Sequence, residues 1–195
     1  MQKNTFIAHF TPAFSRKNRI DRTLPSIMAA LICTLAVTPA QSHITLEQNS
    51  APASSYYKAT FKVGHGCDGS ATTGITIQIP EGVMGAKPMP KPGWTLEIRT
   101  GKLEKPIEAH GKRITERVTQ ISWKGGPLPD TYYDEFVLMG QLPPEKGTLW
   151  FNVIQDCEKG QTAWTEQPST GQSAHELAHP APKLEVIEGA TGHAH

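Results

Sequence analysis

The sequence has little of what marks several common protein classes. Its 195 residues include three cysteines, 7% aromatic residues and nearly balanced charges, with 19 Lys and Arg against 18 Asp and Glu. This balance excludes a polybasic nucleic-acid binder, and the composition fits one globular domain rather than a disordered chain or a collagen-like repeat. The sequence also has no serine-centred nucleophile elbow and no phosphate-cradling glycine loop, so neither of these enzyme motifs is present.

A long transmembrane run is missing as well, although residues 27–37 are apolar. About eleven residues are too few to cross a bilayer as a helix, and a basic segment precedes them, which is the order of a secretory signal peptide. Ala40 and Ser42 have the small side chains that a signal peptidase requires. We therefore expect cleavage of residues 1–42, and a periplasmic or otherwise extracytoplasmic protein that begins at His43 and has no transmembrane helix.

This cleavage would change both the charge and the cysteine count. The mature chain keeps 14 Lys and Arg against 17 Asp and Glu, a formal charge of −3, so attraction to nucleic acid has no support. Cys33 leaves with the signal peptide, and Cys67 and Cys157 remain as an even pair in an oxidising compartment. We predict a disulfide bond between them.

Short segments of alternating apolar and polar residues recur through the mature chain. They are residues 44–48, 56–63, 74–79, 94–99, 114–123, 135–140 and 148–154. Such alternation, rich in β-branched and aromatic residues and interrupted by Gly and Pro, is typical of strands. The pattern predicts an all-β domain over residues 43–167, an antiparallel sandwich of two sheets with about seven strands.

The strand pattern stops at residue 167, and residues 168–195 are rich in Ser, Gly, Pro and His. We interpret them as a flexible tail. His175 and His179 are four residues apart and would face one another on a helix. Residues 175–179, His-Glu-Leu-Ala-His, match the HExxH pattern of metalloproteases in sequence, but they stand in a segment that we interpret as a tail and not as the helix that the pattern requires. This composition favours a solvated tail that attracts metals weakly over a dedicated set of ligands.

A histidine at the new N-terminus has unusual chemistry. The α-amino nitrogen and the Nδ1 atom of His43 can chelate one metal ion together, and both can be neutral donors near neutral pH. Nitrogen donors suit Cu(II), which also stands at the top of the divalent affinity order. Cu(II) is therefore the predicted ion, unless His43 is simply the first residue of a processed chain.

Several motifs occur in one order along residues 43 to about 167. They are HITL at 43–46, GHGCDGS at 64–70, IPEG at 79–82, PGW at 92–94, WKGG at 123–126, LPD at 128–130, DEF at 134–136, and QDC at 155–157 with Trp164. In this succession the chain resembles the YcnI-type copper-binding family, formerly a domain of unknown function. The resemblance implies an exported immunoglobulin-like β-sandwich that holds one Cu(II) beside its N-terminal histidine, a tryptophan and a carboxylate. It makes His43 the N-terminal ligand and Trp123 the tryptophan next to the metal.

The carboxylate ligand that the resemblance implies has no direct counterpart in this sequence. Many relatives have a glutamate in the turn after the second strand, whereas this chain has His65 and Asp68 there. Asp68 could replace the glutamate, and His65 could instead supply a second imidazole on a turn held by the disulfide. His65 could equally be a turn histidine bonded to backbone.

Three functions are compatible with these residues. The resemblance favours a copper carrier, chaperone or sensor without turnover, whose partners are the copper ion and other exported or membrane copper-handling proteins. The alternatives are a copper oxidase of the histidine-brace type and a metal-free, adhesion-like sandwich.

Overall fold

The computed structural model describes residues 43–109 and 111–189. The predicted signal peptide, residues 1–42, and the last two histidines, His193 and His195, lie outside the described residues. Within the described ranges, no helix has the length and apolar character needed to cross a membrane.

The described residues form twelve strands and one short 3-10 helix. The elements are β1 (Thr45–Leu46), β2 (Ser50–Pro52), β3 (Tyr56–Val63), β4 (Thr72–Gln78), β5 (Met84–Pro88), β6 (Trp94–Ala109), β7 (Lys112–Leu128), β8 (Asp134–Gln141), β9 (Gly147–Trp150), β10 (Val153–Cys157), β11 (Gln161–Trp164), η1 (Ala174–Glu176) and β12 (Lys183–Ile187).

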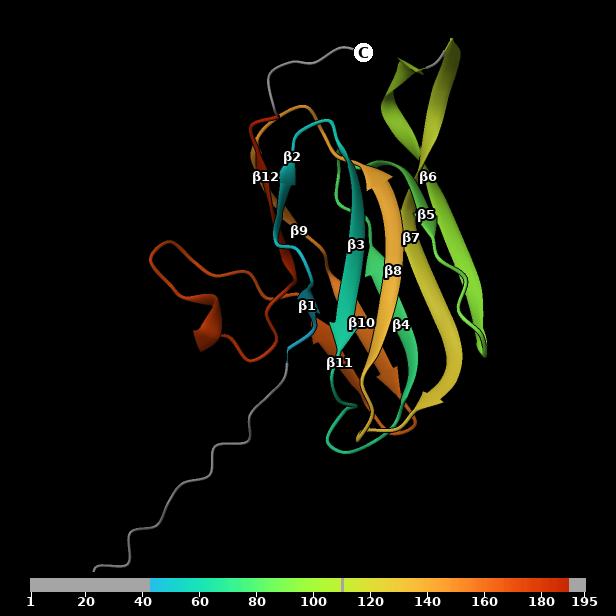
Figure 1. Cartoon of the computed structure of the whole chain (residues 1–195), viewed down its shortest axis with the longest axis vertical. Coiled ribbons are helices and arrows are strands. Elements are labelled where there is room, and N and C mark those ends of the chain that lie inside the picture. The colour runs from blue at the N-terminus through green and yellow to red at the C-terminus, as the bar shows by residue number, and fades with distance from the viewer. Residues whose placement is uncertain (1–42, 110, 190–195) are drawn as a thin grey trace, which may run out of the picture. The chain divides into compact units, whose positions relative to one another are not determined.

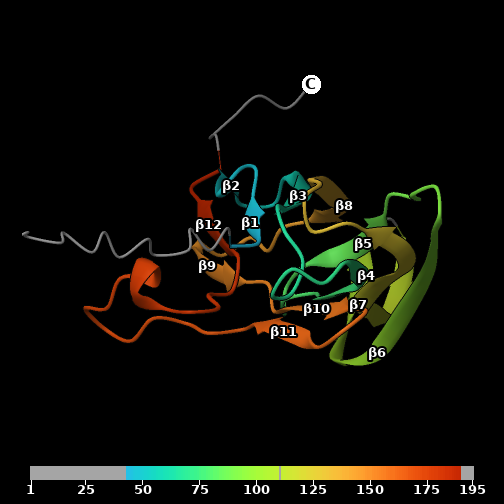
Figure 2. The ribbon, with the colours of Figure 1, turned by 90° about the horizontal axis from the view of Figure 1, so that it is seen from below.

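The strands make three sheets (Figure 1), with the orders β1-β3-β8-β5, β11-β10-β4-β7-β6 and β2-β12-β9. The first two sheets lie in separate layers when seen along the strands (Figure 2). Every pairing among the described strands is antiparallel except that of β2 with β12. The all-β sandwich predicted from the alternating pattern is confirmed, and a third, three-stranded sheet adds to the two that were predicted.

Alternating side chains fill the space between the two larger sheets. Phe61 of β3 and Phe136 of β8 are completely buried, as are Ile75 of β4 and Trp123 of β7. Trp123 packs edge-on against Phe136, with 5.7 Å between ring centres. The core therefore joins the two layers through large apolar side chains, whose burial favours folding by roughly 1.5–3 kcal/mol each.

The structure has twelve strands where the sequence predicted about seven. The predicted strand 148–154 divides into β9 and β10, which belong to different sheets. At the division, the Phe151 backbone N–H donates to Pro182 O and Asn152 O accepts from the Gln78 N–H, at 2.9 Å each. Neighbours on two sides thus break one apolar run into two strands.

The predicted flexible tail over residues 168–195 is wrong for residues 183–187. This segment is β12, which pairs with β2 and β9 and buries Leu184 and Val186 at 0% and 4% exposure. Its sequence, Lys-Leu-Glu-Val-Ile, alternates as a strand does. Burial of this apolar face holds the segment in the sandwich.

The predicted disulfide between Cys67 and Cys157 is confirmed. It joins the turn after β3 to the last residue of β10, across 90 positions of the sequence. The turn before β4 is thereby fixed to the neighbouring strand of the five-stranded sheet.

Candidate functional site

The pairing of β1 with β3 brings His43 close to His65. Thr45 lies opposite Lys62 in this antiparallel ladder, so continuing the register places His43 opposite Gly64, one residue before His65. Ile44 anchors the start of β1 because its side chain is buried, at 3% exposure. Two histidines that are 22 positions apart in the sequence therefore meet at one end of the first sheet.

A third residue, Trp164 at the end of β11, contacts the rings of both histidines. The centre of the His43 ring lies 5.9 Å from that of the Trp164 ring, and the His65 ring centre lies 6.1 Å from it. Both imidazoles approach edge to face, the arrangement that aromatic rings prefer. Trp164 is 2% exposed, so its indole is held in place by its neighbours, and we call it the wall of the candidate site.

Gln155 of β10 holds this wall and the His65 turn together. Its side chain is completely buried and accepts from the Trp164 indole N–H at 3.0 Å. Its amide nitrogen donates to the backbone oxygen of His65 at 2.7 Å and to the hydroxyl of Thr72 at 2.8 Å. One buried amide thus fixes both sides of the candidate site.

Gly66 makes the turn itself possible. A Cβ atom added at this position would lie 1.8 Å from the backbone oxygen of Ser70, so no other residue type fits without a shift of the backbone. The Gly66 N–H also donates to Asp130 Oδ1 at 2.8 Å. The turn that carries His65 is therefore tight and anchored.

The hydrogen bond of His65 defines which of its nitrogens is free. Nδ1 lies 2.5 Å from the Gly66 carbonyl oxygen, and because a carbonyl only accepts, Nδ1 donates. In the neutral ring Nε2 then carries the lone pair, and this atom is buried with no hydrogen-bond partner among residues 43–109 and 111–189. Buried polar atoms rarely lack partners, and an imidazole oriented by one nitrogen is the usual form of a metal ligand.

His43 is also poised as a neutral donor. Partial burial lowers the pKa of its imidazole below the usual 6.5, and the positive charges that His175, His179 and His65 can carry lower that pKa further. A lower pKa keeps the ring nitrogen unprotonated at neutral pH, which metal binding requires.

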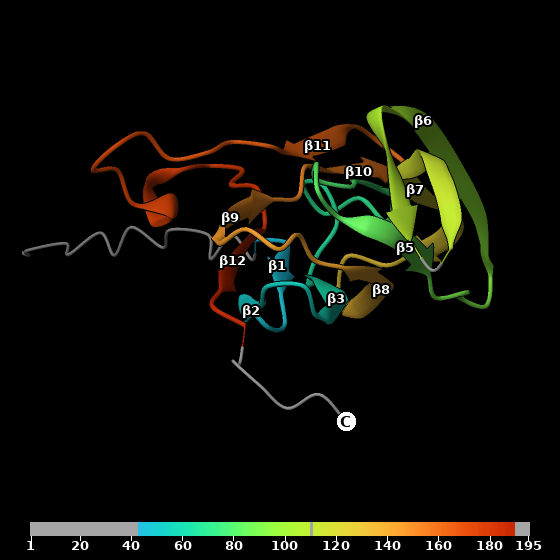
Figure 3. The ribbon, with the colours of Figure 1, turned by 90° about the horizontal axis from the view of Figure 1, so that it is seen from above.

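The structure brings a further histidine to the same indole. His179 lies in the segment between β11 and β12, residues 165–182, which we call the strap (Figure 3). Its ring centre is 5.3 Å from that of Trp164. The sequence interpretation treated His179 as part of a solvated tail and missed this contact.

The tryptophan that resemblance assigned to the site, Trp123, lies elsewhere. Its indole N–H donates to the Met89 backbone oxygen at 3.0 Å, and the residue is fully buried in β7. Strand β7 is three positions from β11 in its sheet, a separation of about 14 Å at the usual strand spacing. The tryptophan that contacts His43 is Trp164, and the structure does not bring Trp123 to this histidine.

Asp68 is not part of the cluster around Trp164 either. It is exposed in the turn between Cys67 and Ser70 and lines a separate hollow with Asp130 and Glu158. Of the two candidates for the missing glutamate, the structure places His65 next to His43.

The donors fit Cu(II) in their chemistry, although they are not yet gathered at one point. Among residues 43–109 and 111–189, no three His, Cys, Asp or Glu side chains lie close enough to hold a metal ion as they stand. The imidazoles instead share one aromatic neighbour. Rotation of the His43 and His179 side chains toward the fixed Nε2 of His65 is the movement that binding would require.

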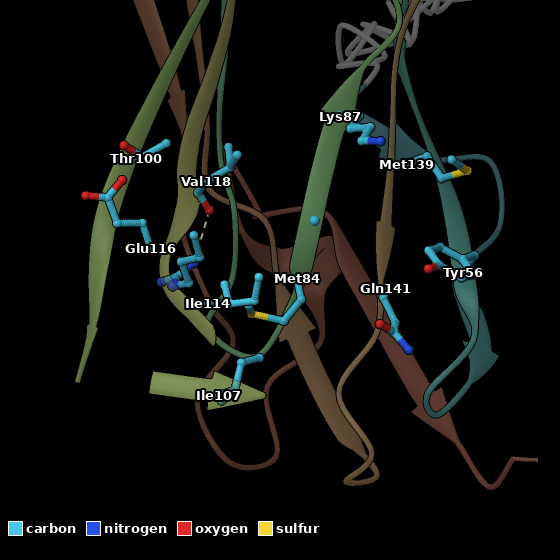
Figure 4. Close-up of a pocket in the computed structure, with 12 residues that line it drawn as sticks. Tyr56, Met84, Lys87, Thr100, Ile107, Ile114, Glu116, Val118, Met139 and Gln141 are labelled. Atoms are coloured by element: carbon cyan, nitrogen blue, oxygen red, sulfur yellow. Dashed lines mark hydrogen bonds between the residues drawn. The ribbon is translucent and has the colours of Figure 1, made fainter. Parts of the chain in front are cut away.

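A separate groove of about 380 Å³ lies between β5, β7 and β8 (Figure 4). Met84 and Ile114 point toward one another in it, and its lining contains neither histidine nor cysteine. This groove therefore offers no imidazole nitrogen and no thiolate for a metal.

The layered sheets and the histidines around Trp164 define an immunoglobulin-like β-sandwich with an imidazole-rich end. A crystal structure of an uncharacterized protein from Nocardia farcinica, described as having an immunoglobulin-like fold, is similar to this chain. The two share 25% identity and a TM-score of 0.57 over 74% of this chain and 97% of the other. No curated protein matches the chain.

The family profile described as Domain of unknown function (DUF1775) matches residues 43–186. The chain belongs to this family, which is the one indicated by the motifs in the sequence. The match begins at His43 and extends into β12. Both the candidate N-terminal ligand and the strap therefore belong to the family domain.

Proposed function

We propose that the mature chain begins at His43 and binds one Cu(II) ion as an exported copper-handling protein, a carrier, chaperone or sensor without turnover. The α-amino nitrogen and the ring of His43 would chelate the ion, and Nε2 of His65 would add a second imidazole. Copper is the cargo in this proposal.

The observation that carries the proposal is the unpaired, buried Nε2 of His65 beside the neutral ring of His43. Leaving such an atom without a partner costs about 1–3 kcal/mol, and a bound metal would remove that cost. The disulfide adds support in two ways. It fixes the turn that carries His65, and a disulfide is compatible with an oxidising compartment.

The surroundings of His43 favour holding the ion over oxidation chemistry. Its ring is partly buried, and Trp164 and the histidines of the turn and the strap surround it. A catalytic copper site needs an open position for its substrate, whereas a crowded site suits storage or transfer. This crowding supports the non-enzymatic role.

The test compares the chain that begins at His43 with a Met–His43 chain, which differs by one residue. The added residue converts the chelating amine into an amide, so we expect the dissociation constant for Cu(II) to rise roughly a hundredfold in competition titrations. Equal affinities for the two proteins would contradict the N-terminal chelate.

A second pair of variants tests the role of His65. His65→Ala should weaken Cu(II) binding and change the nitrogen hyperfine pattern in electron paramagnetic resonance. His110→Ala is the matched control, because the strands that flank position 110, β6 and β7, lie at or next to the sheet edge opposite β11. An effect of equal size in the control would exclude a specific role for His65.

A further inference from the structure

The strap carries a histidine onto the same wall as the two candidate ligands. Of the three imidazoles that face Trp164, His179 is nearest to it, with ring centres 5.3 Å apart against 5.9 Å for His43 and 6.1 Å for His65. All three approach the indole edge to face. Each of the three rings therefore contacts the same indole, with its centre within about 6 Å of the centre of the Trp164 ring.

His179 is held there by the backbone and not by its ring. Its N–H donates to Glu166 Oε2 at 2.8 Å, and its carbonyl oxygen accepts from the Glu166 N–H at 3.1 Å. The Ala181 N–H donates to the backbone carbonyl oxygen of Glu166 at 2.8 Å. No part of this anchor uses the imidazole nitrogens, so they stay available to a ligand.

Both ends of the strap are fixed in the sandwich. It leaves β11 at Trp164 and enters β12 (Figure 2). Leu184 and Val186 of β12 are buried. A free tail would lose conformational entropy when it bound a metal, and that loss is the main argument against tail histidines as ligands. Because the strap is already anchored, most of this loss has occurred before any metal arrives.

We propose that His179 is the third imidazole of the metal site, supplied by the strap. This inference rests on the proposed function and extends it from a mainly N-terminal chelate to a site shared by both ends of the domain. With the amine and ring of His43 and Nε2 of His65, His179 makes four nitrogen donors, the kind of set that a tetragonal Cu(II) site takes.

His175 is the competing histidine on the strap. It lies on η1, whose first turn is capped by Ser173 and Glu176, and it is exposed. Its positive charge also lowers the pKa of the His43 imidazole. It makes no ring contact with Trp164 comparable to that of His179 among the described residues, so we assign the ligand to His179.

The experiment uses the full processed chain beginning at His43, loaded with one equivalent of Cu(II). The variants are His179→Ala, His179→Phe, His175→Ala and the control His110→Ala. The His179→Phe variant keeps an aromatic ring against Trp164 and removes the nitrogens. Pulsed electron paramagnetic resonance counts coordinated imidazoles through their remote ring nitrogens, and competition titration gives the dissociation constant.

We expect both His179 variants to lose one imidazole signal and to raise the Cu(II) dissociation constant about ten- to hundredfold, with His175→Ala and His110→Ala unchanged. The thermal unfolding midpoint of metal-free His179→Phe should equal that of the parent, which separates ligand loss from unfolding of the strap.

The outcomes distinguish this inference from the proposed function. If Met–His43 weakens binding while both His179 variants keep every imidazole signal and full affinity, the proposed function stands and the role of His179 is overturned. Loss of the signal in His175→Ala alone would also overturn it. Equal affinity of Met–His43 and the processed chain would overturn the proposed function whatever the His179 variants show.

Discussion

Gln155 has three hydrogen-bonded partners, and each lies in a different part of the candidate site. They are the backbone oxygen of His65, the hydroxyl of Thr72 and the indole N–H of Trp164. The side chain is fully buried, so water cannot replace these bonds if they are lost. Gln155 is therefore a positioning residue, which fixes Trp164 and the His65 turn without itself being a candidate metal ligand.

Replacing this amide should loosen the site and the fold together. Gln155→Leu leaves the three partners unpaired, and we expect it to lower the free energy of unfolding by about 3 kcal/mol in denaturant titrations and to weaken Cu(II) binding. Gln161→Leu is the matched control because Gln161 is exposed on β11, and its expected change is within about 0.5 kcal/mol. Similar losses in both variants would show that the buried network has no special role.

The lowered pKa of His43 gives the metal-free protein a specific dependence on pH. The unfolded chain takes up a proton on His43 near pH 6.5, whereas the folded chain, with Trp164, His65, His175 and His179 around the ring, takes it up only at lower pH. Stability should therefore fall as pH decreases through 6.5, because the unfolded state binds more protons there.

A variant isolates this contribution. In the presence of a chelator, the thermal unfolding midpoint should fall less between pH 7.5 and pH 5.5 for His43→Gln than for the parent. His110→Gln should behave like the parent. An identical fall in His43→Gln and the parent would mean that His43 is not responsible.

At the scale of elements, the sequence predicted those strands that bury one face along their whole length. Strand β3 alternates clearly, and its predicted bounds, residues 56–63, match the structure. Strand β5 was missed because its sequence, Met-Gly-Ala-Lys-Pro, has no strand-like alternation, and neighbouring β8 determines its conformation. Strand β12 does alternate, but it follows a Pro- and His-rich segment that resembles a tail.

The candidate site was predictable only in part for the same reason. The approach of His43 to His65 follows from antiparallel pairing of the first long strand with the segment before it, which sequence patterns indicate. The placement of Trp164 depends on the register of β11 on β10. The placement of His179 depends on the hydrogen bonds that its backbone makes with Glu166. Such tertiary pairings leave no local signal, so resemblance pointed to Trp123 instead.

The role of β12 can be tested within that strand. Leu184→Ala removes a fully buried side chain and should lower the free energy of unfolding by about 2–5 kcal/mol. Ile187→Ala is the matched control because Ile187 is 49% exposed in the same strand, and its expected cost is below about 1 kcal/mol. Chemical denaturation measures both values. Equal costs would mean that residues 183–187 do not pack as a strand.

At the scale of the whole molecule, the site draws on segments from both ends of the described chain. His43 precedes β1, His179 precedes β12, and the disulfide ties the His65 turn to β10 across 90 positions. A loop of that length makes the crosslink worth roughly 4–5 kcal/mol in the chain-entropy account. Under the proposed function, cleavage before His43, oxidation and folding must therefore all precede metal binding.

Native mass spectrometry of the protein recovered from a secreting cell in the presence of copper tests this account most directly. We predict the mass of the chain starting at His43, less two hydrogens for the Cys67–Cys157 bond, with one copper ion bound. A chain that starts at any other residue, or a correctly processed and oxidised chain that retains no copper, would contradict the central claim that the N-terminal histidine forms a copper site.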